Sequence, residues 1–242
     1  MFWTLVLVAV AVGMGSYAQG VAGFGFGLIA SPLIAALAGP RAAVIGVAVE
    51  ATLQSLYVMR RLRRDVRWRT VGLITSASLL GVPLGLLIFS HLSKRSLTAI
   101  IGTLVLVFAV LLWRGWQVPD TRLTEVLAGI VSGSLSTSTG TTGPPLVITF
   151  HGRGMAPNEF RASLAGVFMV QGIASIAVFA VAGKFDASVW RVIAVGIPAM
   201  IAGWLLGDRT FGRTRPERFR KIVLGMLVVS GFVAVTAGIF AS

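Results

Sequence analysis

The chain has 242 residues, of which 56% are hydrophobic and only 12% are charged. A soluble domain carries roughly a quarter charged residues, so this composition excludes an ordinary soluble protein and indicates an integral membrane protein. The formal net charge of +13 does not indicate a nucleic-acid partner, because twelve of the 21 Lys and Arg residues lie in two short loops, Arg60–Arg69 and Arg209–Lys221. Such clusters are the usual orientation signal of membrane proteins, which keep cationic loops in the cytoplasm.

Cysteine is absent, and the only histidines are His91 and His151. This excludes disulfides, thiolate chemistry and His-rich metal sites, and we expect neither a metal nor a cofactor. The sequence at Met1-Phe2-Trp3 has no positively charged region, and no cleavage site follows the first apolar run. We therefore interpret that run as a retained helix rather than a signal peptide.

Eight apolar segments follow one another, and a helix needs about 20 such residues to cross a bilayer. They are Phe2 to about Leu37, Ala42–Met59, Thr70–His91, Leu97–Trp113, Leu123–Phe150, Ala162–Gly183, Trp190–Gly207 and Val223–Ala241. The first segment is too long and too rich in glycine for one simple helix. Because the connecting loops are short, the sequence predicts a single all-α membrane domain.

The first and fifth segments carry similar motifs, which indicates an internal duplication. The aligned pairs are Gly20 with Gly133, Gly27 with Gly140 and Pro32 with Pro145 at an offset of 113 residues, Pro40 with Pro157 and Gln54 with Gln171 at 117, and Gly81 with Gly203 and Gly85 with Gly207 at 122. We predict two membrane repeats, residues 1–116 and 117–242. Many transporters are built from such repeats, with the substrate between them.

The distribution of charge predicts how the two repeats are oriented. If all eight segments cross, Lys and Arg divide 10 against 11 between the two faces; if the fifth segment enters and returns to the same face, they divide 16 against 5. The positive-inside rule favours the second layout. The second repeat is then inverted, and each repeat opens with a broken or re-entrant helix.

The fifth segment is unsuited to a lipid-facing helix between Gly133 and Pro145. It holds three glycines, two consecutive prolines and seven Ser or Thr hydroxyls, all of which weaken a helix. Irregular backbone at membrane depth is tolerated only where protein or a water-filled cavity covers it. An unwound stretch frees N–H groups, and the half-helix that follows points its positive end at the same place. Donors without a carboxylate suit a small anion as substrate.

The predicted site therefore combines the two broken motifs with nearby polar side chains. The residues expected to bind the anion are Gly23, Phe24, Gly25, Phe26, Gly27, Gln54, Thr137, Ser138, Thr139, Gly140, Thr141, Thr142, Gly143, Gln171 and Arg161. The competing interpretation of the glycines is close helix packing, for which small residues at four-residue spacing are typical. Arg161 is also interpretable as a residue that snorkels to the membrane interface.

Glu50 is the ionisable residue that stands out within an apolar segment. Glu50 and Gln54 are four residues apart and share a helix face. A lone carboxyl among apolar residues favours its protonated form, which suits a proton-coupling site. The competing interpretation is a neutral glutamic acid held by hydrogen bonds in the protein core.

Two motifs resemble those of the sulfite exporter TauE/SafE family. One is Gly-x-x-Gly-Phe-Gly-x-Gly-Leu from Gly20 to Leu28, and the other is Ser-Thr-x-Thr-Gly-Thr-x-Gly-Pro-Pro-Leu-Val from Ser136 to Val147. The resemblance extends over the whole chain and includes Glu159–Ala162. It implies a multi-pass transporter of the bacterial inner membrane that moves sulfite, organosulfonates or related small anions. Many members have more glycines where this chain has Phe24, Phe26 and Leu28.

Other classes of protein are less compatible with the sequence. A membrane-embedded enzyme is disfavoured, because the chain has no Gly-x-Ser-x-Gly motif, no cluster of metal ligands and no carboxylate pair within a segment. An anion channel stays open as the alternative to a proton-coupled carrier. The expected partners are the lipid bilayer and a small anionic substrate, and the sequence predicts no particular oligomeric state.

Overall fold

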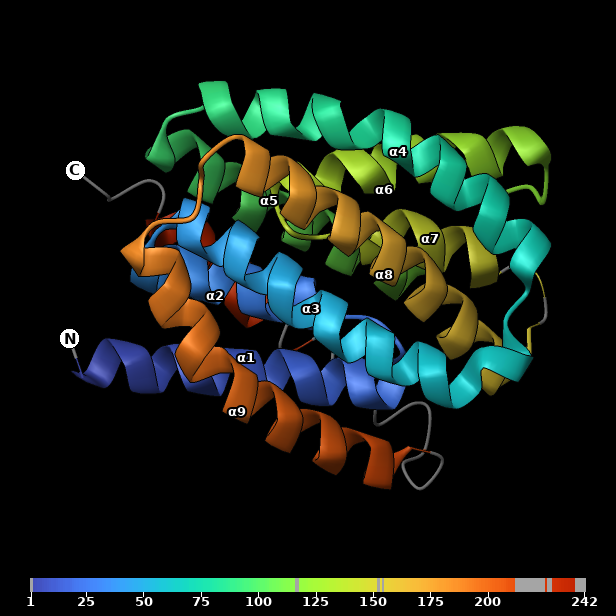
Figure 1. Cartoon of the computed structure of the whole chain (residues 1–242), viewed down its shortest axis with the longest axis horizontal. Helices are drawn as coiled ribbons and strands as arrows, with labels where there is room; N and C mark the ends of the chain where they lie inside the picture. The colour runs from blue at the N-terminus through green and yellow to red at the C-terminus, as the bar shows by residue number, and fades with distance from the viewer. Residues whose placement is uncertain are drawn as a thin grey trace.

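The computed structural model describes residues 2–115, 118–151, 153, 155–211, 225 and 228–237. The helices are α1 (Phe2–Ala22), α2 (Phe26–Ala38), α3 (Pro40–Leu62), the short 3₁₀ helix η1 (Arg63–Asp65), α4 (Trp68–His91), α5 (Lys94–Arg114), α6 (Arg122–Ser138), α7 (Gly143–His151), α8 (Pro157–Val181) and α9 (Ala187–Thr210) (Figure 1). A further apolar helix covers Val228–Ala237. The predicted all-helical fold is confirmed.

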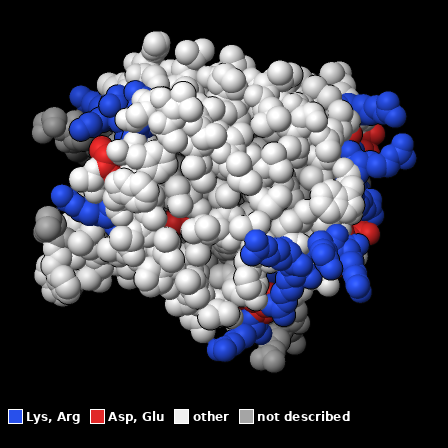
Figure 2. Space-filling view, in the orientation of Figure 1, with Lys and Arg blue, Asp and Glu red and all other residues white. Residues whose placement is uncertain are grey.

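Six of these helices are long and apolar enough to cross a membrane, namely α1, α3 with η1, α4, α5, α8 and α9. Figure 2 shows the charged residues gathered towards the two ends of the molecule, with a mostly uncharged band between them. Trp3, Trp68, Trp113 and Trp190 are exposed close to helix ends. Tryptophan is typical of the membrane–water interface, so these positions fit a bundle that spans the bilayer.

Local sequence explains where several helices begin and end. Ser93, Thr121 and Asp186 precede α5, α6 and α9, and each accepts a hydrogen bond from a backbone N–H of the first turn. Such N-caps satisfy donors that have no partner within the helix. Pro157 opens α8 at a position where proline is favoured, and Gly115 ends α5 in the left-handed conformation that glycine adopts without strain.

Both elongated segments are broken where the sequence predicts a break. The first break, between α1 and α2, contains Gly23 and Gly25 with φ of 82° and 110°. The second break, between α6 and α7, contains Gly140 with φ of 71°. These values lie in the left-handed region, which glycine adopts readily and other residues do not. The arms of the second segment are unequal, 17 residues in α6 and 9 in α7.

The loops divide between the two ends of the bundle. The turn after α3, the start of α6, the end of α7 and the end of α9 all lie at one end (Figure 1). Ion pairs confirm this arrangement, because Arg61 pairs with Asp208 and Arg67 pairs with Glu159. We call this end, which carries Arg60–Arg69, the basic face. The starts of α3, α5 and α9 lie at the opposite face (Figure 1). Arg41, Lys94, Arg95, Lys184 and Arg191 lie in or directly before these helix starts.

Glycines bring pairs of helices together closely. α9 packs along α1, and α4 packs along α6. A β-carbon added at Gly203 or Gly207 would overlap carbonyls of α1, and one added at Gly81 or Gly85 would overlap carbonyls of α6. Membrane helices approach each other in this way because lipid provides no hydrophobic force between them. α3 and α8 pack against each other between these pairs.

Some predictions concern residues outside the described part of the chain. They are the basic loop beyond Phe211, the two ends of the last apolar segment and the side chain of His151.

Candidate functional site

The two helix breaks meet each other inside the bundle. A β-carbon added at Gly27 would overlap the carbonyl oxygen of Gly140, so α2 and the second break are in direct contact. The Ser31 hydroxyl, one turn further along α2, donates a 2.6 Å hydrogen bond to the carbonyl oxygen of Thr139. Gly143, at the start of α7, packs towards Phe24 of the first break. The structure thus brings together the two predicted motifs, which are more than one hundred residues apart in the sequence.

The hydroxyls of the second break differ in what they do. Thr137 donates to the carbonyl oxygen of Val82 at 2.8 Å, and Ser138 donates to that of Ser134 at 2.7 Å. Thr139 and Thr141 contact each other through their hydroxyls at 2.6 Å. Thr139 also donates to the carbonyl oxygen of Leu135 at 3.1 Å. Thr137, Ser138 and Thr139 therefore all contact helix backbone, and Thr139 is in addition paired with Thr141 at the break.

Each of the two predicted glutamines contacts a helix that leads into a break. Gln171 donates to the Ser132 hydroxyl at 3.1 Å, and that hydroxyl lies 2.7 Å from the carbonyl oxygen of Thr142 in the second break. Gln54 accepts from the Ser16 hydroxyl of α1 at 3.2 Å. Gln171 is thus connected to its break through one serine, while Gln54 is held on α1 several residues before the first break.

Most residues of the breaks are shielded from both faces of the bundle. Thr137, Thr139 and Thr141 have no exposed surface, and Gln171 is equally buried. Phe24, Gly27 and Thr142 are half-buried. The level at which the breaks meet is therefore largely buried among the described residues, with partial exposure at these three positions.

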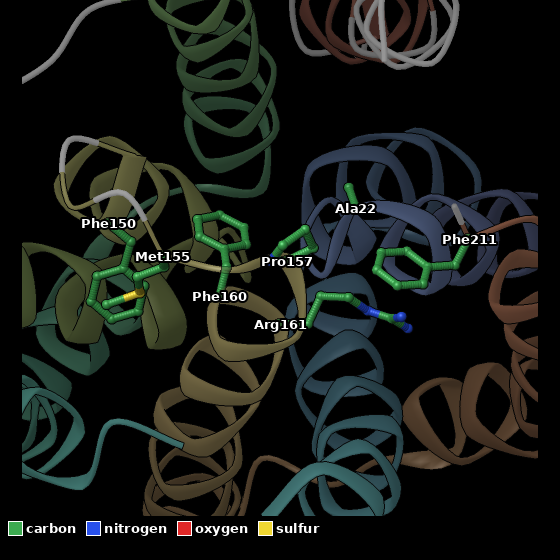
Figure 3. A pocket seen from close by; sticks show the side chains of 7 residues that line it. All are labelled: Ala22, Phe150, Met155, Pro157, Phe160, Arg161 and Phe211. Carbon is green, nitrogen blue, oxygen red and sulfur yellow. The ribbon is translucent and has the colours of Figure 1, made fainter. Parts of the chain in front are cut away.

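A pocket opens beside the first break at the basic face, and Figure 3 shows the side chains that line it. Its volume is about 260 Å³. The walls are mainly apolar and include Phe150, Met155, Phe160 and Phe211, while Arg161 supplies the charge. The pocket adjoins the break, because Ala22 at the end of α1 also lines it.

Arg161 is the charged side chain of this pocket, and it is only 5% exposed. It therefore does not snorkel to the membrane interface. Its Nη2 donates to Asp208 at 3.1 Å, its guanidinium lies 4.0 Å from the ring centre of Phe211, and its Nε has no partner. A β-carbon at Gly23 would lie 2.7 Å from the Arg161 Cγ, so the first break packs on the stem of this arginine.

Glu50 is fully buried in α3, and neither of its carboxyl oxygens has a hydrogen-bond partner. The interpretation of Glu50 as a carboxyl held by core hydrogen bonds is therefore not supported. A β-carbon at Gly196 of α9 would overlap the carboxyl, so this glycine provides the space for it. Among the described residues, none forms an ion pair with Glu50.

Several residues of this region are missing from the prediction based on sequence, among them the apolar lining of the pocket. Asp208 and Phe211 lie at the pocket, and Ser31 joins the two breaks. Asp208 could have been found from the sequence, because it is a single carboxylate directly before a basic cluster at the end of an apolar segment. Ser31 has no such signal, because serine is common in membrane helices.

Comparison with known proteins identifies the family. The model of the sulfite exporter TauE/SafE family matches residues 6–234. The chain belongs to this family. The prediction of a transporter rather than an enzyme is thereby confirmed. Separately, no group of His, Cys, Asp and Glu within the described residues could hold a metal ion.

Two relatives are similar to the chain over most of its length. One is a probable sulfite/organosulfonate exporter, TauE, of Cupriavidus necator, which is 30% identical over 91% of this chain and 89% of its own length. The other is a probable inner membrane transporter protein, TsaS, of Comamonas testosteroni, which is 27% identical over 69% of this chain and 72% of its own length. Together with the six spans, the latter confirms a multi-pass inner-membrane protein. No solved structure matches the chain.

Proposed function

We propose that this protein is a secondary transporter that carries a small anion, sulfite or an organosulfonate, across the bacterial inner membrane. Its family and the TauE relative of Cupriavidus necator support this substrate class. The observation that carries the proposal is the contact between the two helix breaks, at Gly27 and Gly140, inside a bundle of membrane-spanning helices.

The anion binds where the breaks meet. Backbone N–H groups freed at the breaks donate to its oxygens. The hydroxyls of Thr139 and Thr141 do the same when they turn from Leu135 and from each other towards the anion. Such charge-assisted hydrogen bonds hold an anion without a lysine or arginine beside it. The N-terminus of α7 begins at Gly143 and turns its positive end towards the same region. Gln171 supports the second break through Ser132.

The pattern of helix contacts supports two repeats, residues 1–116 and 117–242. If α1 to α4 are exchanged with α6 to α9, the main contacts are preserved: the α1–α9 contact becomes the α4–α6 contact, and the α3–α9 contact becomes the α4–α8 contact. The central contact between α3 and α8 is left unchanged by this exchange. An exchange of this kind is expected when two copies of one unit are related by a two-fold axis.

The geometry at the breaks supports an offset of 117 residues rather than 113 for this part of the repeat. Gly23 and Gly140 are the left-handed glycines that end α1 and α6. Gly23 packs on Arg161, and Gly140 packs on Val44. Both pairs, Gly23 with Gly140 and Val44 with Arg161, have the offset of 117 that also relates Gln54 to Gln171.

The second repeat is inverted with respect to the first, and the basic face is cytoplasmic. α6 and α7 have their outer ends at the basic face, whereas α1 begins and α2 ends at the opposite face (Figure 1). The α6–α7 hairpin therefore enters from the basic face. The α1–α2 segment begins and ends at the opposite face, with α1 long enough to reach across. Arg60–Arg69 lies on the basic face, as the positive-inside rule requires of a cytoplasmic end.

Proton coupling is assigned to Glu50. A buried carboxyl without a partner is costly when charged, so its protonation changes how closely α3 and α9 pack at Gly196. The close contact between the two breaks at Gly27 and Gly140 favours such a carrier over an open anion pore.

The test is flux into proteoliposomes. Uptake of ³⁵S-labelled sulfite, and of an organosulfonate such as benzenesulfonate, is measured with and without a pH gradient, and protein-free vesicles serve as the control. We expect saturable uptake that responds to the pH gradient and is inhibited by unlabelled substrate. Flux that does not saturate and follows only the membrane potential would make the protein a channel. Absence of flux with these anions, together with uptake of carboxylates, would remove the proposed substrate class.

A further inference from the structure

The pocket at Arg161 has the features of a second anion site, and this inference rests on the proposed function. We propose that this pocket is a separate cytoplasmic vestibule site for a monoanion with an apolar part, and that Asp208 is an internal counter-ion that the arriving anion displaces from Arg161. The vestibule site consists of Arg161, Asp208, Arg61 and the apolar side chains Phe150, Met155, Phe160 and Phe211.

The charges at the vestibule site are not balanced. The Asp208 carboxylate is shared, since its Oδ1 contacts Arg161 at 3.1 Å and its Oδ2 contacts Arg61 at 2.7 Å. Two guanidinium groups and one carboxylate leave one positive charge without compensation among the described residues. Binding of a monoanion would neutralise this cluster.

Arg161 has the geometry of a residue that can take a ligand. Only 5% of Arg161 is exposed, and its Nε donor has no hydrogen-bond acceptor. An unsatisfied buried donor on a charged group is costly. An anion with two or three oxygens would satisfy Nε and Nη2 together, in the bidentate mode that arginine prefers.

The walls of the pocket define the rest of the ligand. Apart from Arg161, its lining consists of aromatic rings, Met155, Pro157 and Ala22 (Figure 3). An enclosed apolar cavity of about 150 Å³ binds benzene, and this partly open pocket of about 260 Å³ has room for a ring of that size beside Arg161. The pocket therefore fits an anion that carries a hydrocarbon group better than it fits a bare, fully hydrated oxyanion.

Displacement of Asp208 has a consequence for the fold. The Arg161–Asp208 contact joins α8 to α9 at the basic face, while the Arg61–Asp208 contact joins α3 to α9. When the anion occupies Arg161, Asp208 keeps only Arg61, and the end of α9 separates from α8. Gly23 packs on Arg161, so this movement takes place directly beside the first break and opens the way to it.

The test uses a single cysteine in a chain that has none of its own. Met155→Cys lies in the pocket, and its labelling by N-ethylmaleimide is followed while benzenesulfonate, methanesulfonate or sulfate is added. We expect benzenesulfonate to protect at the lowest concentration and sulfate to protect least. Asn158→Cys, on the same face but outside the pocket lining, is the control and keeps its labelling rate.

Substitutions of Asp208 and of its partner Arg61 should act in opposite directions. Asp208→Asn removes the internal competitor, so half-protection should need about tenfold less benzenesulfonate. Arg61→Gln leaves Asp208 with Arg161 as its only partner, so half-protection should need more benzenesulfonate. Arg61 is exposed, so this variant keeps the proposal testable even if Asp208→Asn does not fold. Asp120→Asn, which alters an ion pair with Arg153 elsewhere on this face, should have no effect.

The proposal would be overturned if benzenesulfonate, at concentrations that saturate transport, did not protect Met155→Cys from labelling. It would also be overturned if neither Asp208→Asn nor Arg61→Gln changed the concentration needed for half-protection. Both results would leave the transport function intact. Conversely, protection at Met155→Cys in a protein that transports none of the tested anions would contradict the proposed function and leave the vestibule site standing.

Discussion

Gly27 and Gly140 touch where the two broken helices meet, and the contact leaves no room for a side chain at position 27. The carbonyl oxygen of Gly140 occupies the place that a β-carbon of residue 27 would take. Close helix packing and ligand binding were alternative interpretations of the glycines in the first motif. The structure gives Gly27 a packing role, while the positive φ of Gly23 and Gly25 produces the break itself.

Gly27→Ala should therefore push the two breaks apart. Overpacking against backbone costs about 1–3 kcal/mol, so we expect a lower unfolding temperature and loss of transport. Gly72→Ala is the matched control, because nothing lies within 4 Å of an added β-carbon there and alanine favours the helix by about 1 kcal/mol. If Gly27→Ala transported normally and were as stable as Gly72→Ala, the contact between the breaks would not exist.

The threonines of the second break should separate into two groups. Thr139→Val and Thr141→Val should weaken anion binding roughly ten- to a hundredfold, since a hydrogen bond to a charged ligand contributes about 1.5–3 kcal/mol. Thr137→Val removes a bond to the Val82 carbonyl and should lower stability more than affinity. Affinity is measured by isothermal titration in detergent and stability by thermal unfolding.

Thr98→Val is the control for this series, because Thr98 donates only to its own helix, at Lys94. Unchanged affinity in both Thr139→Val and Thr141→Val would place the anion elsewhere.

Glu50→Gln should preserve the fold but remove the response of transport to a pH gradient. The amide has nearly the shape of the protonated carboxyl and fits the space beside Gly196, yet it cannot release a proton. Flux is measured in proteoliposomes at several internal and external pH values. Glu159→Gln, at the basic face, is the control and should keep the response. A normal pH response in Glu50→Gln would exclude Glu50 from coupling.

The α6–α7 hairpin should leave residues 121 and 158 on the same side of the membrane. Single cysteines at Thr121, Asn158 and Asp65 should react with an impermeant maleimide only from the cytoplasm, whereas one at Lys184 should react only from outside. Labelling in right-side-out and inverted vesicles distinguishes these cases. Reaction of Thr121→Cys and Asn158→Cys from opposite sides would mean that α6 and α7 together cross the membrane. A further cysteine at Thr214 tests the basic loop outside the described residues, for which the sequence also predicts the cytoplasm.

Asp186 should contribute to stability in a pH-dependent way. Hydrogen bonds from the Ser188 hydroxyl and from the backbone N–H of Val189 lower the pKa of this N-cap carboxyl. A lowered pKa in the folded state means that its contribution is complete above the ordinary pKa of aspartate and is lost as the pH falls through the lowered value. Asp186→Ala should cost about 1 kcal/mol at neutral pH.

Asp186→Asn keeps an N-cap acceptor and provides the comparison. The difference in unfolding temperature between the wild type and Asp186→Asn should shrink on acidification, and a difference independent of pH would contradict the assignment.

The sequence by itself determined the membrane class, the positions of the apolar segments and the two breaks, because these depend on local properties. Apolar length decides whether a helix can span the membrane. Gly23, Gly25 and Gly140 have positive φ, a conformation that interrupts a helix wherever it packs. Positive charge near helix ends likewise acts through the adjacent bilayer and needs no knowledge of tertiary contacts.

Only the tertiary structure decided which helix faces meet. In a soluble protein the apolar stripe of a helix marks its buried side, but lipid is as apolar as leucine, so this signal is weak in a membrane bundle. The contact of Gly27 with Gly140, the bond from Thr137 to Val82, and the sharing of Asp208 between Arg61 and Arg161 all join residues from different helices. Their chemistry depends on packing between distant segments, and hydropathy and charge along the chain do not encode it.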